Sequence, residues 1–201
     1  MAFTYFFRDV QTLELACDHA LPVLKTRRYI NIWDAGCAMG PEAYTLAILL
    51  RERMGHMYFR NVRITATDID GSNLFDKIIS EGVYPREQVE RIPEDLFNSY
   101  FEKAEQEDCY RVIEEIRRAL TFYRHDLLTL QAPGNDFGLI VCKNVLLHFN
   151  EEQRIKVIQM FYDSLMEGGF LVFEQTQALP QKVAHLFQPV VSNAQLFQKI
   201  V

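Results

Sequence analysis

Residues 30–42 read INIWDAGCAMGPE and decide the fold. A predicted strand over 30–35 leads into a turn that contains Gly36 and Gly40, and a predicted amphipathic helix over 42–54 follows. Glycine has no Cβ, so the backbone at both positions can turn sharply and approach a ligand. Free N–H groups at the start of the helix are expected to face the same space. The pattern is typical of a nucleotide-binding corner.

The next predicted strand supplies an acid at the same edge of the sheet. It covers residues 62–67 and ends at Asp68, which we expect to accept hydrogen bonds from both hydroxyls of a ribose. The glycines are spaced Gly-x-x-x-Gly, whereas a pyrophosphate-binding turn has Gly-x-Gly-x-x-Gly. These features favour an S-adenosylmethionine (SAM) methyltransferase over a nicotinamide dehydrogenase. A purely structural turn with a buried Asp is the alternative at this point.

Composition excludes several classes of protein. The chain has 201 residues, 49% of them hydrophobic, enough for one domain with a small appendage. A net charge of −6 argues against a nucleic-acid-binding surface. The cysteines show no C-x-x-C spacing and are interpreted as reduced thiols, and the histidines are too scattered to predict a metal site. Without a leader-like or membrane-length apolar run, we expect a cytoplasmic protein with no membrane insertion.

Hydrophobic periodicity beyond the first corner predicts alternating strands and helices. Further strands are predicted over 137–142, 169–175 and 196–201, and further helices over 10–24, 72–81 and 151–166. Gly168-Gly169 is interpreted as a helix stop and turn. This alternation predicts an α/β fold in which helices cover both faces of a parallel sheet.

The interval from Tyr84 to Leu128 is longer than one crossover connection requires. A short helix is predicted over 92–101, and strands over 110–113 and 120–124. We interpret residues 84–124 as a small antiparallel β subdomain whose last strand re-enters the main sheet. A helical excursion through 114–119 is the alternative. The prediction is thus one domain over 1–201 with this insertion.

Six motifs in a fixed order carry a family resemblance. They are Thr4-x-Phe6-Phe7-Arg8, Trp33-x-Ala35-Gly36-Cys37-x-x-Gly40-x-Glu42, Ala66-Thr67-Asp68-Ile69-Asp70, Asp126-Leu127-Leu128, Cys142-Lys143-Asn144-Val145-Leu146-Leu147-His148-Phe149 and Gly168-Gly169-Phe170-Leu171. The chain from Phe3 onward resembles the CheR family, SAM-dependent protein-glutamate O-methyltransferases of bacterial chemotaxis. The resemblance implies a Rossmann-like, mostly parallel seven-stranded sheet, with residues 84–124 corresponding to the family's β subdomain.

The resemblance also implies roles for individual residues. Thr4 and Arg8 would reach over the cofactor and the acceptor end of the pocket, with Arg8 pairing the incoming carboxylate. Glu42 would hold the amino end of SAM and Asp68 its ribose hydroxyls, because acids match a ligand that carries an ammonium and a sulfonium. Further cofactor contacts are implied at Gly36, Gly40, Asp126, Leu127, Asn144 and Val145. Taken singly, Thr4 and Asp126 also fit caps, Asn144 a loop closure and Arg8 a surface ion pair.

Two substitutions in the fifth motif depart from the family pattern. Lys143 replaces an arginine, and His148 replaces a tyrosine near the acceptor. An imidazole titrates near neutral pH and differs in its chemistry from a tyrosine hydroxyl, so the choice of substrate is open. The candidate catalytic residues are therefore Arg8 and His148. The sequence starts at the catalytic domain's first motif, so we expect no N-terminal helical domain of the kind that contacts receptors in the family.

Three hypotheses follow for the activity. The first is a protein carboxyl methyltransferase, which needs no general base because a carboxylate is already ionised; its acceptor would be a chemoreceptor-like signalling protein. The second is a methyltransferase for a small molecule or a hydroxyl, with His148 as the base. The third is a non-catalytic SAM-binding protein. Residues 105–109 contain three acids and no glycine, which argues against binding of a receptor-tail pentapeptide through the subdomain.

Overall fold

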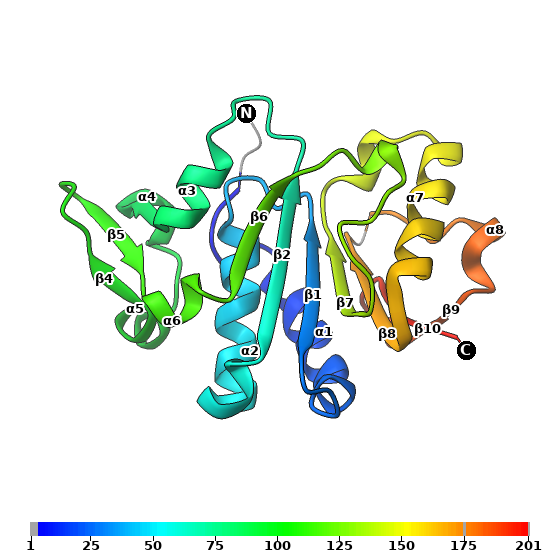
Figure 1. Cartoon of the computed structure of the whole chain (residues 1–201), viewed down its shortest axis with the longest axis horizontal. Helices are drawn as coiled ribbons and strands as arrows, with labels where there is room; N and C mark the ends of the chain where they lie inside the picture. Colours follow the sequence, from blue (N-terminus) through cyan, green and yellow to red (C-terminus); the bar gives the residue numbers. More distant parts are fainter. Residues whose placement is uncertain (1–3, 175, 201) are drawn as a thin grey trace.

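A seven-stranded sheet forms the centre of the computed structural model, which describes residues 4–174 and 176–200 (Figure 1). Its strands are β1 (Ile30–Ala35), β2 (Val62–Asp68), β6 (Leu120–Arg124), β7 (Phe137–Cys142), β8 (Leu165–Phe173), β9 (Phe187–Pro189) and β10 (Leu196–Lys199). They lie in the order β6-β2-β1-β7-β8-β10-β9. β10 runs antiparallel to both of its neighbours, and the other pairs are parallel. The predicted fold class is confirmed.

Helices cover both faces of this sheet, as the alternating side chains of β1 require. Ile30 and Ile32 pack with α1 (Val10–Leu24) and α2 (Pro41–Phe59) in one core cluster. Trp33 packs with α7 (Glu151–Ser164) on the opposite face. Figure 1 shows α1 and α2 behind the sheet and α7 in front of it. α8 (Gln181–Ala184) lies near the far edge, before β9.

The long insertion forms a second, smaller sheet beside the first. β3 (Val83–Pro85), β5 (Cys109–Val112) and β4 (Phe101–Lys103) pair antiparallel in that order. The short helices α4 (Arg86–Val89) and α5 (Glu94–Tyr100) connect β3 to β4, α3 (Phe75–Glu81) precedes β3, and α6 (Glu114–Arg117) follows β5. The chain then returns as β6 beside β2, as predicted. The alternative of a helix after residue 114 is also realised, because α6 forms one turn between β5 and β6.

The interpretation of Gly168-Gly169 as a helix stop and turn is wrong. α7 ends at Ser164, and β8 already begins at Leu165 and runs through both glycines. Phe137 pairs with Leu165 but Leu139 pairs with Phe170, so the extra residues of β8 form a bulge. A Cβ on Gly169 would lie 3.0 Å from two backbone carbonyl oxygens, which explains why the bulge needs glycine.

Other element boundaries differ by a few residues. α3 begins at Phe75 rather than at 72, because the Asp70 carboxylate accepts from the amides of Ser72 and Phe75 and holds the intervening loop out of the helix. α2 extends past the predicted end to Phe59, with a kink at Gly55. Positions 175 and 201, where two predicted strands end, lie outside the described residues. Within the described ranges, no helix combines the length and apolar character needed to cross a bilayer.

Candidate functional site

A cavity of about 360 Å³ lies where β1, β2 and β7 end. Open α/β sheets bind their ligands at the carboxyl ends of the strands, and small-molecule sites have volumes of about 300–1,000 Å³. Every residue predicted for the site lines this cavity except Gly40; they are Thr4, Arg8, Gly36, Glu42, Asp68, Asp126, Leu127, Asn144, Val145 and His148. Segments far apart in the sequence therefore meet in one place.

Gly36 allows the turn after β1 to pass directly against Val145. Its φ is +97°, and a Cβ there would lie 2.2 Å from Val145 Cγ2, which no side chain tolerates. The amides of Gly36 and Cys37 donate to the carbonyl of Thr67 at 2.7 and 3.0 Å. These amides join the end of β1 to the end of β2. They precede the start of α2 at Pro41, so the expectation of free N–H groups at the helix start stays a prediction.

Gly40 is not among the residues that line the cavity, and its expected contact with the cofactor stays a prediction. Its φ is +98°, and a Cβ there would lie 2.8 Å from Ile79 Cγ1 and 2.9 Å from the Tyr84 hydroxyl. Its carbonyl accepts the amide of Tyr44 at the start of α2. Gly40 therefore lets the chain turn into α2 where the side chains of Ile79 and Tyr84 pack closely against its backbone.

Asp68 extends its carboxylate from the end of β2 into the cavity wall. Oδ2 accepts from the backbone amide of Ala38 at 3.0 Å, and Oδ1 accepts from that of Asp70 at 3.2 Å. An ionised carboxylate offers about four acceptor positions. Two positions therefore remain on a side chain whose orientation is already fixed, which suits the predicted contact with two adjacent hydroxyls.

The 3₁₀ turn η1 (Leu127–Thr129) forms the apolar end of the cavity. Asp126 caps this turn, because its Oδ1 accepts from the amide of Leu128 at 2.9 Å. The cap interpretation of Asp126 thus holds, and the residue also lines the cavity. Leu127, Leu128 and Ile69 add apolar surface beside it. Such a surface next to an acidic group is suited to a planar heterocyclic base above a ribose.

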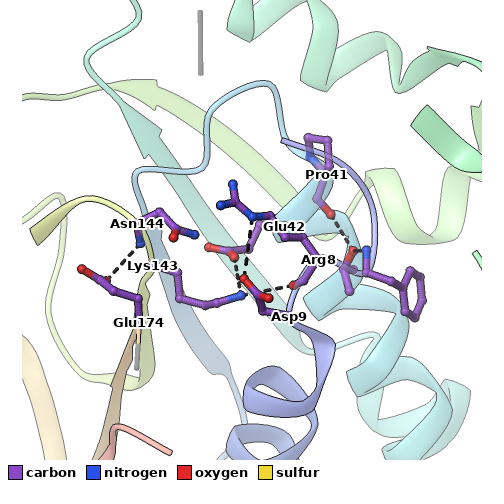
Figure 2. A network of polar contacts seen from close by, with 9 residues as sticks. Arg8, Asp9, Pro41, Glu42, Lys143, Asn144 and Glu174 are labelled. Atoms are coloured by element: carbon purple, nitrogen blue, oxygen red, sulfur yellow. Dashed lines mark hydrogen bonds and ion pairs between the residues drawn. The ribbon is translucent and has the colours of Figure 1, made fainter. Parts of the chain in front are cut away.

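Glu42 and Lys143 form a buried ion pair at the other end of the cavity (Figure 2). Glu42 Oε2 lies 3.0 Å from Lys143 Nζ, and the side chain of Lys143 is only 2% exposed. Lys143 Nζ also donates to the backbone carbonyl of Arg8 at 3.3 Å. Burial raises the pKa of Glu42, and the charges of Lys143 and Arg8 oppose that rise. The lysine therefore anchors both α2 and the N-terminal segment.

Arg8 borders the same end of the cavity with a side chain that is one-third exposed. Its Nε lies 3.7 Å from the exposed Asp9 carboxylate, and Figure 2 shows it converging with Glu42 and Lys143. An ion pair with an exposed partner is weak, about 0–1 kcal/mol. The Asp9 carboxylate therefore contributes little to holding the Arg8 side chain in place.

Asp34 lies on β1 close to this ion pair. It shares a sheet face with Ile30 and Ile32, is fully buried, and has no hydrogen-bond partner on either carboxyl oxygen among the described residues. Burial raises its pKa well above the usual range, the Glu42 charge raises it further, and Lys143 opposes the rise. Burial without a partner therefore favours the protonated form of Asp34.

The segment after β7 positions Asn144, Val145 and His148. Asn144 has a φ of +60°, and its amide donates to Oε2 of the buried Glu174 at 3.0 Å. This left-handed turn directs the chain along the cavity, where the 3₁₀ turn η2 (Leu146–His148) carries His148 to the wall. Asn tolerates the left-handed region better than most residues. The loop-closure interpretation of Asn144 thus holds alongside its place in the cavity.

Sequence reasoning missed several residues of the wall: Tyr5, Leu13, Cys37, Ala38, Thr45, Thr67, Ile69, His125, Leu128, Lys143 and Phe149. Most are sequence neighbours of predicted residues, so extending the motifs by a position would have found them. Lys143 is the most important of these residues. The sequence showed it only as a replacement for the family's arginine, whereas the structure places it in an ion pair with Glu42. Within the described ranges, no cluster of three or more His, Cys, Asp or Glu residues is arranged to hold a metal ion.

Comparison with known proteins gives a consistent match. The family model described as "CheR methyltransferase, SAM binding domain" matches residues 2–196. The chemotaxis protein methyltransferase of Listeria innocua is 36% identical over 168 residues, which are 83% of this chain and 61% of that protein. The chemotaxis protein methyltransferase of Borreliella burgdorferi is 31% identical over 185 residues, 88% of this chain and 64% of that protein. The chain thus spans only 61% and 64% of these relatives' length.

A solved structure shows the same fold at low sequence identity. The rRNA methyltransferase aviRa from Streptomyces viridochromogenes aligns with a TM-score of 0.58 and 13% identity, covering 98% of this chain and 86% of that one. Its likeness concerns the arrangement of strands and helices only.

Proposed function

The chain belongs to the CheR methyltransferase family, and from that premise we propose that it transfers the methyl group of SAM to a glutamate side chain of a protein. The acceptor in this proposal is a chemoreceptor-like signalling protein. One observation carries the proposal: a guanidinium and two acids border a single cavity, with Arg8 and Glu42 at one end and Asp68 toward the other. This charge distribution suits a cationic cofactor and an anionic acceptor.

The cavity's donors and acceptors fit the parts of SAM. When bound, SAM supplies a methyl group on a positively charged sulfur, ready for transfer to a nucleophile. In the proposal, Glu42 binds the α-amino group, and Asp68 accepts from the ribose hydroxyls with the two acceptor positions that its backbone contacts leave. The remaining contacts are assigned to Thr4, Gly36, Asp126, Leu127, Asn144 and Val145. Acids in a partly buried cavity attract a cation more strongly than they do in water.

Arg8 is proposed to hold the acceptor carboxylate. A guanidinium binds a carboxylate through two parallel hydrogen bonds and so fixes both its position and its plane. A glutamate carboxylate is ionised at neutral pH, so no residue has to remove a proton from it. The protein's contribution is then to align the acceptor oxygen with the methyl group and to exclude water from the cavity.

The strongest alternative is a methyltransferase for a hydroxyl acceptor, with His148 as the base. His148 lines the cavity wall, so an acceptor with a hydroxyl group would find a base there. A carboxylate acceptor would use His148 only as part of the wall. The two cases differ in the chemical stability of the product, because a methyl ester is cleaved by mild base and a methyl ether is not.

The test incubates the purified protein with methyl-labelled SAM and host lysate, and then treats the labelled protein with mild base. We expect label on protein, released as volatile methanol, and a rate of labelling lower by about two orders of magnitude or more with Arg8→Ala. Base-stable label would refute the carboxylate acceptor and favour the alternative with His148. Binding of S-adenosylhomocysteine (SAH) without any transfer of label would refute the catalytic proposal. If label appears, the acceptor is then identified by changing the candidate glutamates of a host chemoreceptor's cytoplasmic fragment to alanine.

A further inference from the structure

Several buried acids lie around one buried ammonium group behind the cavity. Lys143 is the only lysine or arginine among the fully buried residues of the described ranges, whereas Asp34 and Glu174 are buried acids and Glu42 is nearly so. Among the residues that the structure describes, only Glu42 forms an ion pair with Lys143. The cluster therefore has more carboxyl groups than buried ammonium groups.

Asp34 differs from its acidic neighbours because its carboxyl group has no hydrogen bond at all among the described residues. Asp68 uses both oxygens to accept backbone amides, and Glu174 uses Oε2 to accept the amide of Asn144. An ionised carboxylate that is fully buried without a partner is too costly to persist, so the group binds a proton instead. Asp34 is thus the buried acid whose carboxyl oxygens both lack a partner among the described residues.

A cofactor's α-amino group would disturb this arrangement. The proposed function brings that ammonium to Glu42, where Lys143 Nζ already lies 3.0 Å away. Two ammonium groups on one carboxylate repel each other in a low-dielectric site. Lys143 is carried on a flexible four-carbon chain. Asp34 on β1 pairs in register with Val141 of β7, two residues before Lys143, so the two residues lie at the ends of neighbouring strands.

We propose that Lys143 moves from Glu42 to Asp34 when the α-amino group of the cofactor occupies the site, and that Asp34 releases its proton in that step. The inference rests on the proposed function, because it requires SAM or SAH in the cavity. The O–H bond of the Asp34 carboxyl group breaks, its electron pair stays on the carboxylate, and the proton is released to solvent. Lys143 is then a positioning residue that leaves Glu42 to the cofactor.

The other charged groups around the cluster do not replace Asp34 in this role. From the N-terminal segment, Arg8 and Asp9 act on Glu42 rather than on Asp34. Asp68 also faces Asp34, and as a second negative charge it favours the protonated form of Asp34. The thiols of Cys37 and Cys142 stay neutral, because burial raises the pKa of both.

Calorimetry of the full chain tests the proposal. SAH is titrated at neutral pH in several buffers that differ in ionisation enthalpy, so that the apparent binding enthalpy reports the number of protons released. We expect about one proton per SAH and an affinity that rises with pH, by up to about tenfold per pH unit while Asp34 titrates. The control ligand is methylthioadenosine, which has no α-amino group and is expected to release no proton.

Two isosteric variants separate Asp34 from its neighbour. Asp34→Asn is expected to bind SAH without releasing a proton, whereas Glu174→Gln, which keeps an acceptor for the Asn144 amide, is expected to release as many protons as the wild type. Infrared difference spectra on adding SAH are expected to show loss of a protonated carboxyl band in the wild type, a readout that needs no variant.

Each outcome has a definite meaning. SAH binding without proton release by the wild type would overturn the proposal and leave the proposed function intact, and so would equal release with methylthioadenosine. Loss of proton release in Glu174→Gln but not in Asp34→Asn would overturn the assignment to Asp34. No detectable binding of SAH by the wild type would overturn both the inference and the proposed function.

Discussion

Replacing Asp68 with alanine should weaken the binding of SAH by about 1–3 kcal/mol, or about 5- to 150-fold, because the proposed contact is a hydrogen bond from ribose to a charged acceptor. The same change removes the acceptors of the Ala38 and Asp70 amides, at 3.0 and 3.2 Å. At about 0.5–1.5 kcal/mol for each net hydrogen bond, the fold should lose about 1–3 kcal/mol. Calorimetry measures the affinity, and urea unfolding without ligand measures the stability.

Asp70→Ala is the matched control for this experiment. Asp70 stands two residues further on and does not line the cavity, yet it accepts from the amides of Ser72 and Phe75 and from the Ser72 hydroxyl. This variant should therefore be destabilised and bind SAH normally. An SAH analogue without the ribose hydroxyls should bind wild type and Asp68→Ala almost equally. Equal affinity of wild type and Asp68→Ala for SAH itself would refute the ribose assignment.

Other variants test the remaining assignments. Arg8→Ala should bind SAH within a few-fold of wild type but lose about two orders of magnitude or more in methylation rate, measured by label transfer, because it removes a group that positions the acceptor. His148→Phe should keep much of its activity with a carboxylate acceptor; a dead His148→Phe beside a fully active Arg8→Ala would reverse the choice of mechanism. In the unliganded protein the folded state raises the pKa of Asp34 and so binds more protons than the unfolded state. The contribution of Asp34 to stability therefore falls as pH rises above about 4, by up to about 1.4 kcal/mol per pH unit until Asp34 titrates in the folded state, and Asp34→Asn should remove this contribution in urea unfolding measured against pH. A receptor-tail pentapeptide should not bind, since residues 105–109 lack glycine, and micromolar binding in a fluorescence titration would contradict this.

Local sequence determined the main elements of the fold. The apolar run 30–35 and the acid after the second strand can be interpreted without tertiary information, since a strand and the turn that ends it depend on neighbouring residues. The capping pair Asn150 and Gln153 likewise marks the start of α7. Local sequence could not predict the bulge at Gly168. Glycine is common both at helix ends and in strand bulges, and only the pairing with β7 distinguishes the two.

The sequence by itself determined which residues meet at the ends of the strands, because parallel strands bring their carboxyl ends to one edge of the sheet. Only the tertiary structure decided what those residues do to one another. Glu42 and Lys143 are far apart in the chain, and nothing local to either residue predicts their 3.0 Å ion pair. The same holds for Asp34, whose pKa depends on burial under α1 and α2 and on charges from other segments. Burial and charge pairing are sums over neighbours in space, and those neighbours exist only once the chain has folded.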